Sequence, residues 1–439
     1  MSLETPPRDP STSEVASTTP RRPTLWRHRD FVKMWSAQTI SQFGDEITQL
    51  ALPLVAILTL DAKPFEIGLL GTFQFLPFIL LTIPAGVWVD RMRRKPILIG
   101  ADIGRALLLS SIPVAFVGGW LSMPQLYVVA FAVGCLEVFF DVAYMSYLPA
   151  VVERDQLVEG NAKLELSVSA SSVIGPGLAG FLVELFRAPF AIVFDVLSYV
   201  GSAIMLLLIR RPETPPAPHD VATGPRPSMR QEAAEGLRYV LGHRYLRNIA
   251  ACTGISNLFG NLGGVILILY IVDVDELGIN PGTVGLIFAI ANVGVFLGAI
   301  SAERLANRIG IGPAIVWSAL AAPLFLLLVA VAPRDAPVPF LIASGVIGAV
   351  STVIYNVNQV SLRQAITPER MQGRMNATMR FIVWGTIPIG SILGGLLGGI
   401  IGLQATIWVG AIGSFLGFLP VLFSSVRTLQ RIPEPEDGS

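Results

Sequence analysis

The feature of this sequence that most limits its fold is a series of long apolar blocks. The hydrocarbon layer of a bilayer is about 30 Å thick and a helix rises about 1.5 Å per residue, so a spanning helix needs about 20 mostly apolar residues. Only 14% of the 439 residues are charged, against about 25% in a typical soluble domain. The blocks predict twelve spanning helices, at residues 31–60, 65–89, 96–117, 124–147, 162–186, 189–209, 247–272, 281–302, 312–332, 337–362, 374–400 and 403–425.

The basic residues give these helices a predicted orientation, because Lys and Arg accumulate on the cytoplasmic side of membrane proteins. With the N-terminus inside, only Lys63, Arg187 and Arg334 fall in outer loops, and Arg105 falls within a span. The other basic residues lie in cytoplasmic segments or at the ends of spans that face them. The sequence therefore predicts an all-α integral membrane protein that crosses the cell (inner) membrane many times, with both termini in the cytoplasm.

The two halves of the chain resemble each other at one constant offset. His28-Arg29 matches His243-Arg244, and Asn161-Ala162 matches Asn376-Ala377. Two pseudo-symmetric six-helix bundles are the architecture of transporters that rock about a central site. The predicted organisation is a disordered cytoplasmic tail (1–26), an N-terminal bundle (27–210), a cytoplasmic linker with an amphipathic helix (211–243), a C-terminal bundle (244–426) and a second tail (427–439).

Polar residues recur every three or four positions along the first, fourth, seventh and tenth spans, which places them on helical stripes. Such groups are costly in a bilayer unless they face the bundle interior or a wet cavity. The stripes predict a central substrate cavity, and the alternative is that these side chains only hydrogen-bond between helices. The cavity candidates are Gln38, Gln42, Gln49, Tyr144, Asn257, Asn261, Tyr355, Asn358 and Gln359.

Acids outnumber bases inside the spans, and a carboxylate without a partner in a low dielectric tends to bind a proton. We expect proton coupling at Asp45 or Glu46 first, then at Asp141 and Glu137. Arg105 is expected to form a structural ion pair with Asp102, three residues earlier, or with an acid of the fourth span. The span acids are Asp45, Glu46, Asp102, Glu137, Asp141 and Asp195, the last of which we expect to hydrogen-bond near Ser198 and Tyr199.

The loop after the second span carries the motif of a known family. Gly86-Val-Trp-Val-Asp90-Arg91-Met-Arg93-Arg94-Lys95 resembles the signature loop of the major facilitator superfamily, although Arg93 replaces a usual glycine. A weaker copy, Glu303-Arg304, follows the eighth span. The resemblance implies a transporter whose loop latches one end state. The latch residues it implies are Gly86, Asp90, Arg91, Arg94, Glu303 and Arg304.

The fifth span carries a second motif of that family. Gly175-Pro176 followed by Ala179-Gly180 resembles the antiporter motif, although Ala162 and Ser171 replace two of its usual glycines. This resemblance implies export rather than import. The run Ser41-Gln42-Phe43-Gly44-Asp45 resembles the branch that includes macrolide efflux proteins and the enterobactin exporter.

These observations favour a secondary active transporter, a proton-coupled antiporter that exports small amphipathic molecules (drugs or siderophore-like metabolites) by alternating access. Its expected partners are the small-molecule substrate, protons and the lipid bilayer, without nucleic acid, and it is expected to be a monomer. A proton-coupled importer or facilitator of a nutrient and a non-transporting receptor or scaffold remain alternatives. No His-Glu-x-x-His motif, Gly-x-Ser-x-Gly elbow or phosphate loop is found, so we expect no enzyme activity, metal or cofactor.

Overall fold

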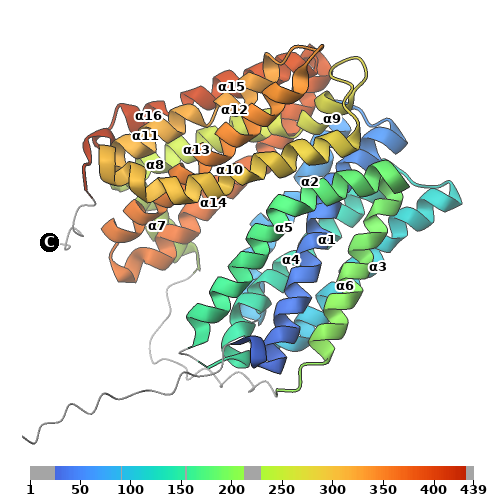
Figure 1. The fold of residues 1–439 in the computed structure, drawn as a ribbon. Coiled ribbons are helices and arrows are strands. Elements are labelled where there is room, and N and C mark those ends of the chain that lie inside the picture. The colour runs from blue at the N-terminus through green and yellow to red at the C-terminus, as the bar shows by residue number, and fades with distance from the viewer. Residues whose placement is uncertain (1–24, 90, 154–155, 212–228, 432–439) are drawn as a thin grey trace, which may run out of the picture.

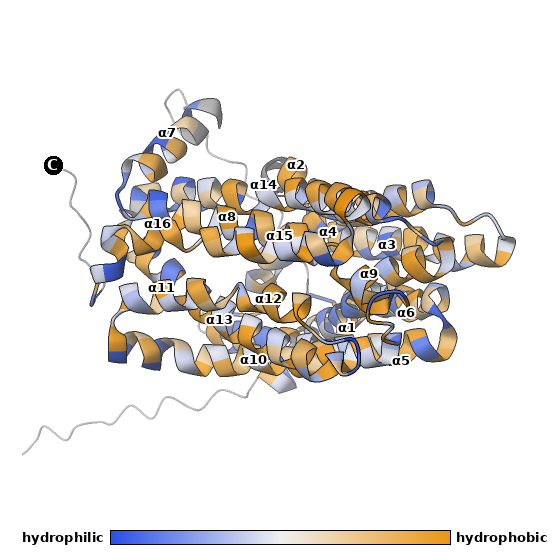
Figure 2. Cartoon of the chain, turned by 90° about the horizontal axis from the view of Figure 1, so that it is seen from above, coloured by the Kyte–Doolittle hydropathy of each residue, from blue (hydrophilic) through white to orange (hydrophobic). Residues whose placement is uncertain are grey.

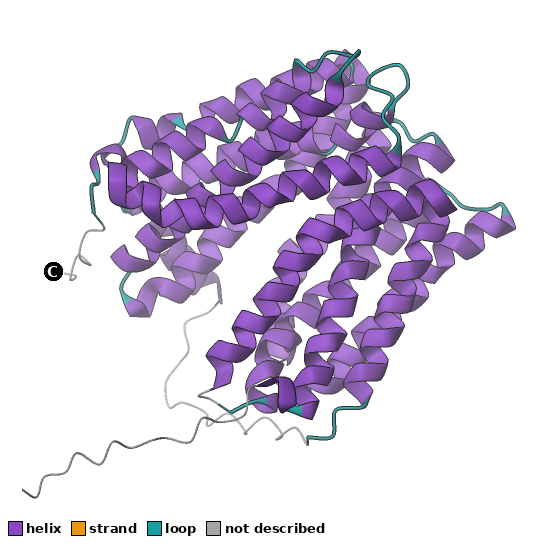
Figure 3. Cartoon of the chain, in the orientation of Figure 1, coloured by secondary structure: helices purple, strands orange, loops and turns teal. Residues whose placement is uncertain are grey.

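The computed structural model describes residues 25–89, 91–153, 156–211 and 229–431, and within them it consists of helices joined by short connections (Figure 3). Twelve stretches of helix in this part of the chain are long and apolar enough to cross a membrane. The first group is α1 (Arg29–Leu60), α2 (Pro64–Val89), α3 (Arg94–Gly118), α4 (Met123–Val151), α5 (Leu157–Phe186) and α6 (Ala188–Leu207).

The second group follows a short helix, α7 (Met229–Gly242), and three of its spans are each divided into two helices. It contains α8 (Leu246–Gly264) with α9 (Leu267–Val272), α10 (Pro281–Ile309), α11 (Ile311–Ala321) with α12 (Leu324–Ala330), α13 (Pro337–Ile366), α14 (Glu369–Ile401), and α15 (Leu403–Leu416) with α16 (Leu419–Leu422). Short 3₁₀ turns, η1 (Leu25–Arg27) and η3 (Ser425–Thr428), flank the two groups. We call them the N-bundle and the C-bundle.

Local capping explains where several helices begin and end. His28 Nδ1 accepts a hydrogen bond from Phe31 N at 3.1 Å and caps α1. Asn280 Oδ1 accepts one from Thr283 N at 2.8 Å and caps α10, whose first residue is Pro281. Both interactions satisfy N–H groups that a helix start leaves unpaired, and proline is favoured at that first position.

Hydrophobic residues predominate along the helices of both bundles (Figure 2), and many of the large ones are exposed. Val117, Leu107 and Ile400 are 73%, 67% and 69% exposed. A soluble protein would bury such residues, whereas a membrane protein presents them to lipid tails, which are themselves apolar.

The two bundles meet at one end and diverge towards the other (Figure 1). We call the end that carries η1, α7 and η3 the linker end, and the opposite end the far end. Contact between the bundles is made mainly by two helix pairs, α5 with α10 and α2 with α14. Each pair takes one helix from each bundle, as a pseudo-symmetric arrangement requires.

Glycines let the helices of these two pairs approach backbone to backbone. A side chain at Gly180 of α5 would begin 2.8 Å from the Cα of Gly285 on α10. A side chain at Gly395 of α14 would begin 2.9 Å from the Cα of Gly68 on α2. Small residues at membrane helix crossings permit this close approach, so glycine is required at both crossings.

The short helix α7 packs at the linker end of α14. Val240 is fully buried, and Gly236 lies against Thr378 and the backbone of Arg374. Glu235 also pairs with Arg374 at 2.7 Å. Leu237 and Leu241, which the sequence places on the same apolar face as Val240, are exposed. Of the predicted tails, 1–26 and 427–439, only residues 25–26 and 427–431 belong to the described residues.

Replacing Gly180 by leucine should separate the bundles at the far end. Helices usually pack 8–10 Å apart and glycine contacts allow less, so we expect an increase of about 2–3 Å. The measurement is the distance between spin labels at Trp120→Cys and Val274→Cys, both exposed positions at the far end, with Cys135 and Cys252 replaced by alanine.

Gly100→Leu is the matched control, because no atom lies within 4 Å of a side chain added at this glycine of α3. Its label distance should equal that of the parent protein. An unchanged distance in Gly180→Leu would mean that the crossing of α5 and α10 does not set the separation of the bundles.

Candidate functional site

A buried arginine ties together four helices of the N-bundle. Arg105 of α3 is 1% exposed, and its Nη2 lies 2.6 Å from Asp102 Oδ1. Its Nη1 lies 3.9 Å from Asp45 Oδ1 on α1. The guanidinium carbon lies 4.4 Å from the ring centre of Phe140 on α4 and 4.2 Å from that of Tyr199 on α6. Ion pairing and cation–π contacts therefore compensate this charge.

Hydroxyl groups hold two of the acids around this arginine. The Tyr199 hydroxyl donates to Asp45 Oδ1. Asp195 accepts from the Thr48 hydroxyl and from Ser198 Oγ, the latter at 2.9 Å. Asp195 thus lies in the hydrogen-bonded position that the sequence predicts, beside Ser198 and Tyr199. The contacts of Asp45 with the arginine and with Tyr199 are both made by its Oδ1, and 38% of the Asp45 side chain is exposed.

Three further acids of the N-bundle have no such partners. Glu46, Glu137 and Asp141 form no hydrogen bond or ion pair with any described residue. Asp141 is exposed and the other two are half-buried. Asp141 interacts electrostatically with Arg105 and, from the other bundle, with Arg380. These three carboxyl groups are available to bind a proton or a ligand.

Two of those acids line a small cavity inside the N-bundle. It has a volume of about 120 Å³ and is walled by residues of α1, α2, α3, α4 and α6. Its polar lining comprises Asp45, Glu46, Thr48, Gln49, Gln74, Glu137 and Tyr199. The cavity brings together three of the four acids that the sequence predicts for proton coupling, and Asp141 is not among its lining residues.

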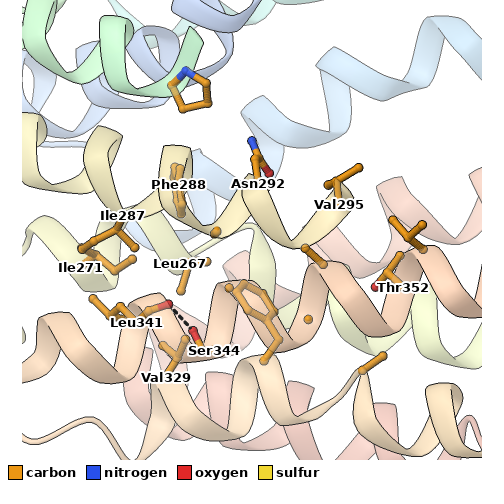
Figure 4. Close-up of a pocket in the computed structure, with 18 of the residues that line it drawn as sticks. Leu267, Ile271, Ile287, Phe288, Asn292, Val295, Val329, Leu341, Ser344 and Thr352 are labelled. Carbon is orange, nitrogen blue, oxygen red and sulfur yellow. Dashed lines mark hydrogen bonds between the residues drawn. The ribbon is translucent and has the colours of Figure 1, made fainter. Parts of the chain in front are cut away.

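A larger and more apolar cavity lies where the C-bundle meets the N-bundle (Figure 4). Its volume is about 490 Å³, and most of its walls come from α9, α10, α12 and α13. The N-bundle contributes Glu46, Gln49 and Pro176. The polar side chains that the C-bundle contributes are Asn292, Ser344 and Thr352. The Ser344 hydroxyl donates to Leu341 O at 2.7 Å.

Glu46 and Gln49 line both cavities. Gly175 explains how Glu46 reaches this position, because a side chain at Gly175 would begin 2.5 Å from the Cβ of Glu46. The first glycine of the predicted antiporter motif therefore makes room for an acid. Pro176 lines the larger cavity, Ala179 is fully buried, and Gly180 forms the crossing with Gly285.

The polar residues predicted on the tenth span face the interior of the C-bundle. The Tyr355 hydroxyl lies 2.7 Å from Thr253 Oγ1. Asn358 donates to Ile354 O at 2.8 Å, and Gln359 donates to Asn356 Oδ1 at 3.5 Å. Tyr355, Asn358 and Gln359 are buried and line neither cavity. The exposed face of α13 instead presents Thr352 and Asn356.

The other predicted cavity residues also lie outside these two cavities. Gln42 accepts from Ser171 Oγ at 3.3 Å. Asn257 donates to Val383 O at 3.3 Å, and Asn261 donates to Asn257 O at 2.8 Å. Gln38 and Tyr144 each carry a buried oxygen without a hydrogen-bond partner. Of the nine predicted cavity residues, Gln49 lines both cavities and the other eight line neither.

The predicted latch residues are dispersed at the linker end. Asp90 lies outside the described residues. Arg91, Glu303 and Arg304 are exposed, and neither Glu303 nor Arg304 pairs with another described residue. Gly86 and Arg94 are half-buried, and no atom lies within 4 Å of a side chain added at Gly86. Arg91, Glu303 and Arg304 make no ion pair between the bundles with a described residue.

Sequence analysis did not identify Asn292 or Thr352. Asn292 is the only amide side chain in the predicted apolar span 281–302. Its Nδ2 donates to Ser172 O of α5. A lone amide in an apolar span was the available signal. The many aliphatic lining residues carry no signal, because apolar residues in a membrane helix look alike whether they face lipid or a cavity.

Comparison with known proteins agrees with this architecture. Residues 22–436 match the family described as "Transmembrane secretion effector". The enterobactin exporters of Escherichia coli and Shigella boydii are 26% identical to this chain over 406 residues, which is 90% of each chain.

Solved structures of transporters share the fold. A bacterial homologue of the iron transporter ferroportin, in an inward-facing state, superposes with a TM-score of 0.71 at 15% identity, covering 90% of this chain and 98% of the other. The nucleoside transporter NupG superposes with a TM-score of 0.68 at 13% identity, covering 90% and 98%. These relatives and structural neighbours are transporters rather than enzymes. The chain belongs to the transmembrane secretion effector family of the major facilitator superfamily and is a multi-pass membrane transporter.

Proposed function

We propose that this transporter is a proton-coupled antiporter that exports small amphipathic molecules by alternating access. One observation carries the proposal: Glu46 lines both the acidic cavity and the large apolar cavity. A carboxyl group shared in this way allows a proton and a substrate to compete for one place. Such competition is the minimum that exchange of the two across a membrane requires.

The large cavity supports an amphipathic substrate. Its volume of about 490 Å³ falls within the range of about 300–1,000 Å³ that is common for small-molecule sites. Its walls are mainly aliphatic and aromatic, and Glu46, Gln49, Asn292 and Thr352 supply polar groups. A mostly apolar hollow with a few polar groups favours a molecule that has both kinds of surface.

The asymmetry between the ends supports an inward-open state. Basic residues gather at the linker end, so by the positive-inside rule this end and both termini face the cytoplasm of a bacterial inner membrane. The bundles touch through glycine crossings nearer the far end and diverge at the linker end. In this arrangement the site is closed to the outside, and the protein acts as a monomer.

The acids then act in sequence. Facing the cytoplasm, Glu46 and its neighbour Glu137 release protons, and the ionised Glu46 accepts a hydrogen bond from a polar group of the substrate. After the bundles tilt, protons from outside neutralise the acids and the substrate loses that interaction. Asp141, exposed on the same bundle, is placed to receive the proton at the linker end.

The direction of transport rests on two observations. The predicted antiporter motif lies at the crossing that closes the far end, with Gly175 against Glu46 and Gly180 against Gly285. The motif thus connects the acid to the contact between the bundles. The similarity to enterobactin exporters also favours export, of a siderophore-like metabolite or of a drug with similar amphipathic character.

Neutralising the shared acid should uncouple transport from the proton gradient. In proteoliposomes screened with amphipathic compounds, Glu46→Gln should lower gradient-driven transport by about tenfold or more, because the glutamine cannot exchange a proton. Asp45→Asn and Asp141→Asn should also lower it. The measurement is the initial rate of movement of a compound that the parent protein transports, with and without the gradient.

Asp335→Asn is the control for these variants, since this acid is exposed in the loop before α13 at the far end. It should transport like the parent. The proton-carrier assignment fails if all three test variants keep the parent rate and gradient dependence. If no compound moves in either direction, the proposal that the substrates are small amphipathic molecules fails.

Removing the buried arginine should destabilise the N-bundle rather than merely slow transport. Arg105→Gln leaves Asp102 buried without its ion-pair partner, which costs about 3–5 kcal/mol in the free energy of unfolding. The midpoint of thermal unfolding in detergent should fall by at least about 5 °C.

The double variant Asp102→Asn/Arg105→Gln should recover part of that loss, because no uncompensated charge remains between the two positions. Arg308→Gln, at an exposed position on α10, should leave the midpoint unchanged. A single Arg105→Gln variant as stable as the parent would show that the pair is not structural.

A further inference from the structure

A third cavity lies nearer the linker end, between the bundles, and none of its residues belongs to the sites described above. Its volume is about 530 Å³. The N-bundle contributes one wall through α2, and the C-bundle contributes the other through α13 and α14. Its lining residues include Phe78, Arg363, Gln364, Asn376, Arg380 and Trp384.

Two arginines give this cavity a positive charge that no lining residue balances. Arg363 and Arg380 line it, and no carboxylate is among its lining residues. Neither guanidinium forms a hydrogen bond or an ion pair with another described residue, and the Nε of Arg363 is buried without a partner. Asp141 acts on Arg380 electrostatically but does not line the cavity. Arg380 is exposed and Arg363 is half-buried. A buried donor such as Arg363 Nε is costly when it has no partner, which argues for a ligand that pairs with it.

Aromatic rings lie beside these charges. The ring of Trp384 is 5.3 Å from that of Phe78, at an interplanar angle of 62°. The Arg380 guanidinium carbon lies 5.6 Å from the centre of the Trp384 ring. Asn376 and Gln364 add amide groups to the same walls. Charge, ring surface and amides therefore occur within one hollow.

We propose that this cavity binds an organic anion that carries a planar aromatic ring. The fork of each guanidinium matches a carboxylate, phosphate or sulfonate, to which arginine donates two parallel hydrogen bonds. Trp384 and Phe78 supply faces and edges for the ring. The assignment rests on the proposed export function in one respect: this cavity is where an acidic aromatic substrate first binds from the cytoplasm.

The position of the cavity fits that role. Phe78 belongs to the N-bundle, whereas Arg363 and Trp384 belong to the C-bundle. A ligand held there contacts both bundles on the side where they diverge. Closing the linker end brings these walls together, so the ligand must move deeper, towards the 490 Å³ cavity, or leave.

A phospholipid headgroup carries the same anionic chemistry as a soluble organic acid. Its phosphate would satisfy the arginines, but a glycerol-linked headgroup offers no ring to Trp384 and Phe78. The ring pair favours the soluble anion. Lipid composition therefore has to be varied in the test.

The test compares 2-naphthoate with the neutral 2-naphthamide, which has nearly the same shape, on the whole protein in phosphatidylcholine nanodiscs. Calorimetric titration without any proton gradient should give a dissociation constant for naphthoate about tenfold or more below that for naphthamide. Arg363→Gln and Arg380→Gln should each remove most of this preference. Arg370→Gln, at an exposed position on the same helix as Arg380, should keep it.

Equal affinity of the parent protein for the two probes would overturn the proposal, and this comparison needs no variant to fold. Unchanged preference in both arginine variants would overturn it as well. Naphthoate binding that disappears when phosphatidylglycerol replaces part of the lipid would assign the site to a headgroup instead. Because no transport is measured, failure here differs from failure of the exporter proposal, which rests on rates across a gradient.

Discussion

The N-bundle depends on one buried charge. Arg105 contacts an acid of α1, an acid of its own helix, a ring of α4 and a ring of α6. In a medium without water these contacts replace hydration, so the four helices keep a fixed arrangement around the guanidinium. One arginine cannot satisfy every acid: the carboxyl groups of Glu46 and Glu137 line the small cavity, and Asp141 is exposed. Acids with fixed partners and acids without them therefore lie within a single cluster.

The C-bundle has a different character despite the internal repeat. At the positions where the N-bundle carries Glu137 and Asp141, the matching residues are Thr352 and Asn356, which are uncharged and exposed. Its large cavity is mainly apolar, and the charged side chains that the C-bundle contributes to the described cavities are Arg363 and Arg380. The two halves therefore offer an acidic wall on one side and an apolar or basic wall on the other, which gives a substrate distinct places for its charged and its apolar parts.

Much of the fold could be predicted from the sequence, because the apolar blocks and the charges between them are strong signals. The predicted span 31–60 corresponds to α1 at Arg29–Leu60, and 189–209 corresponds to α6 at Ala188–Leu207. The residues that line the cavities were harder to predict. On α13 two polar stripes lie close together around the helix, and periodicity does not tell which one faces the hollow. Tyr355 and Asn358 turn inward, whereas Thr352 faces the cavity, a choice made by packing against neighbouring helices.

The glycine crossings also determine how readily the molecule can change shape. At Gly180 with Gly285 and at Gly68 with Gly395, backbone lies on backbone. These two close contacts can serve as a pivot for rotation of one bundle against the other. Because this pivot lies towards the far end, most of the length of each bundle lies between the pivot and the linker end. A small rotation at the glycines therefore produces a large separation of the bundles at the linker end.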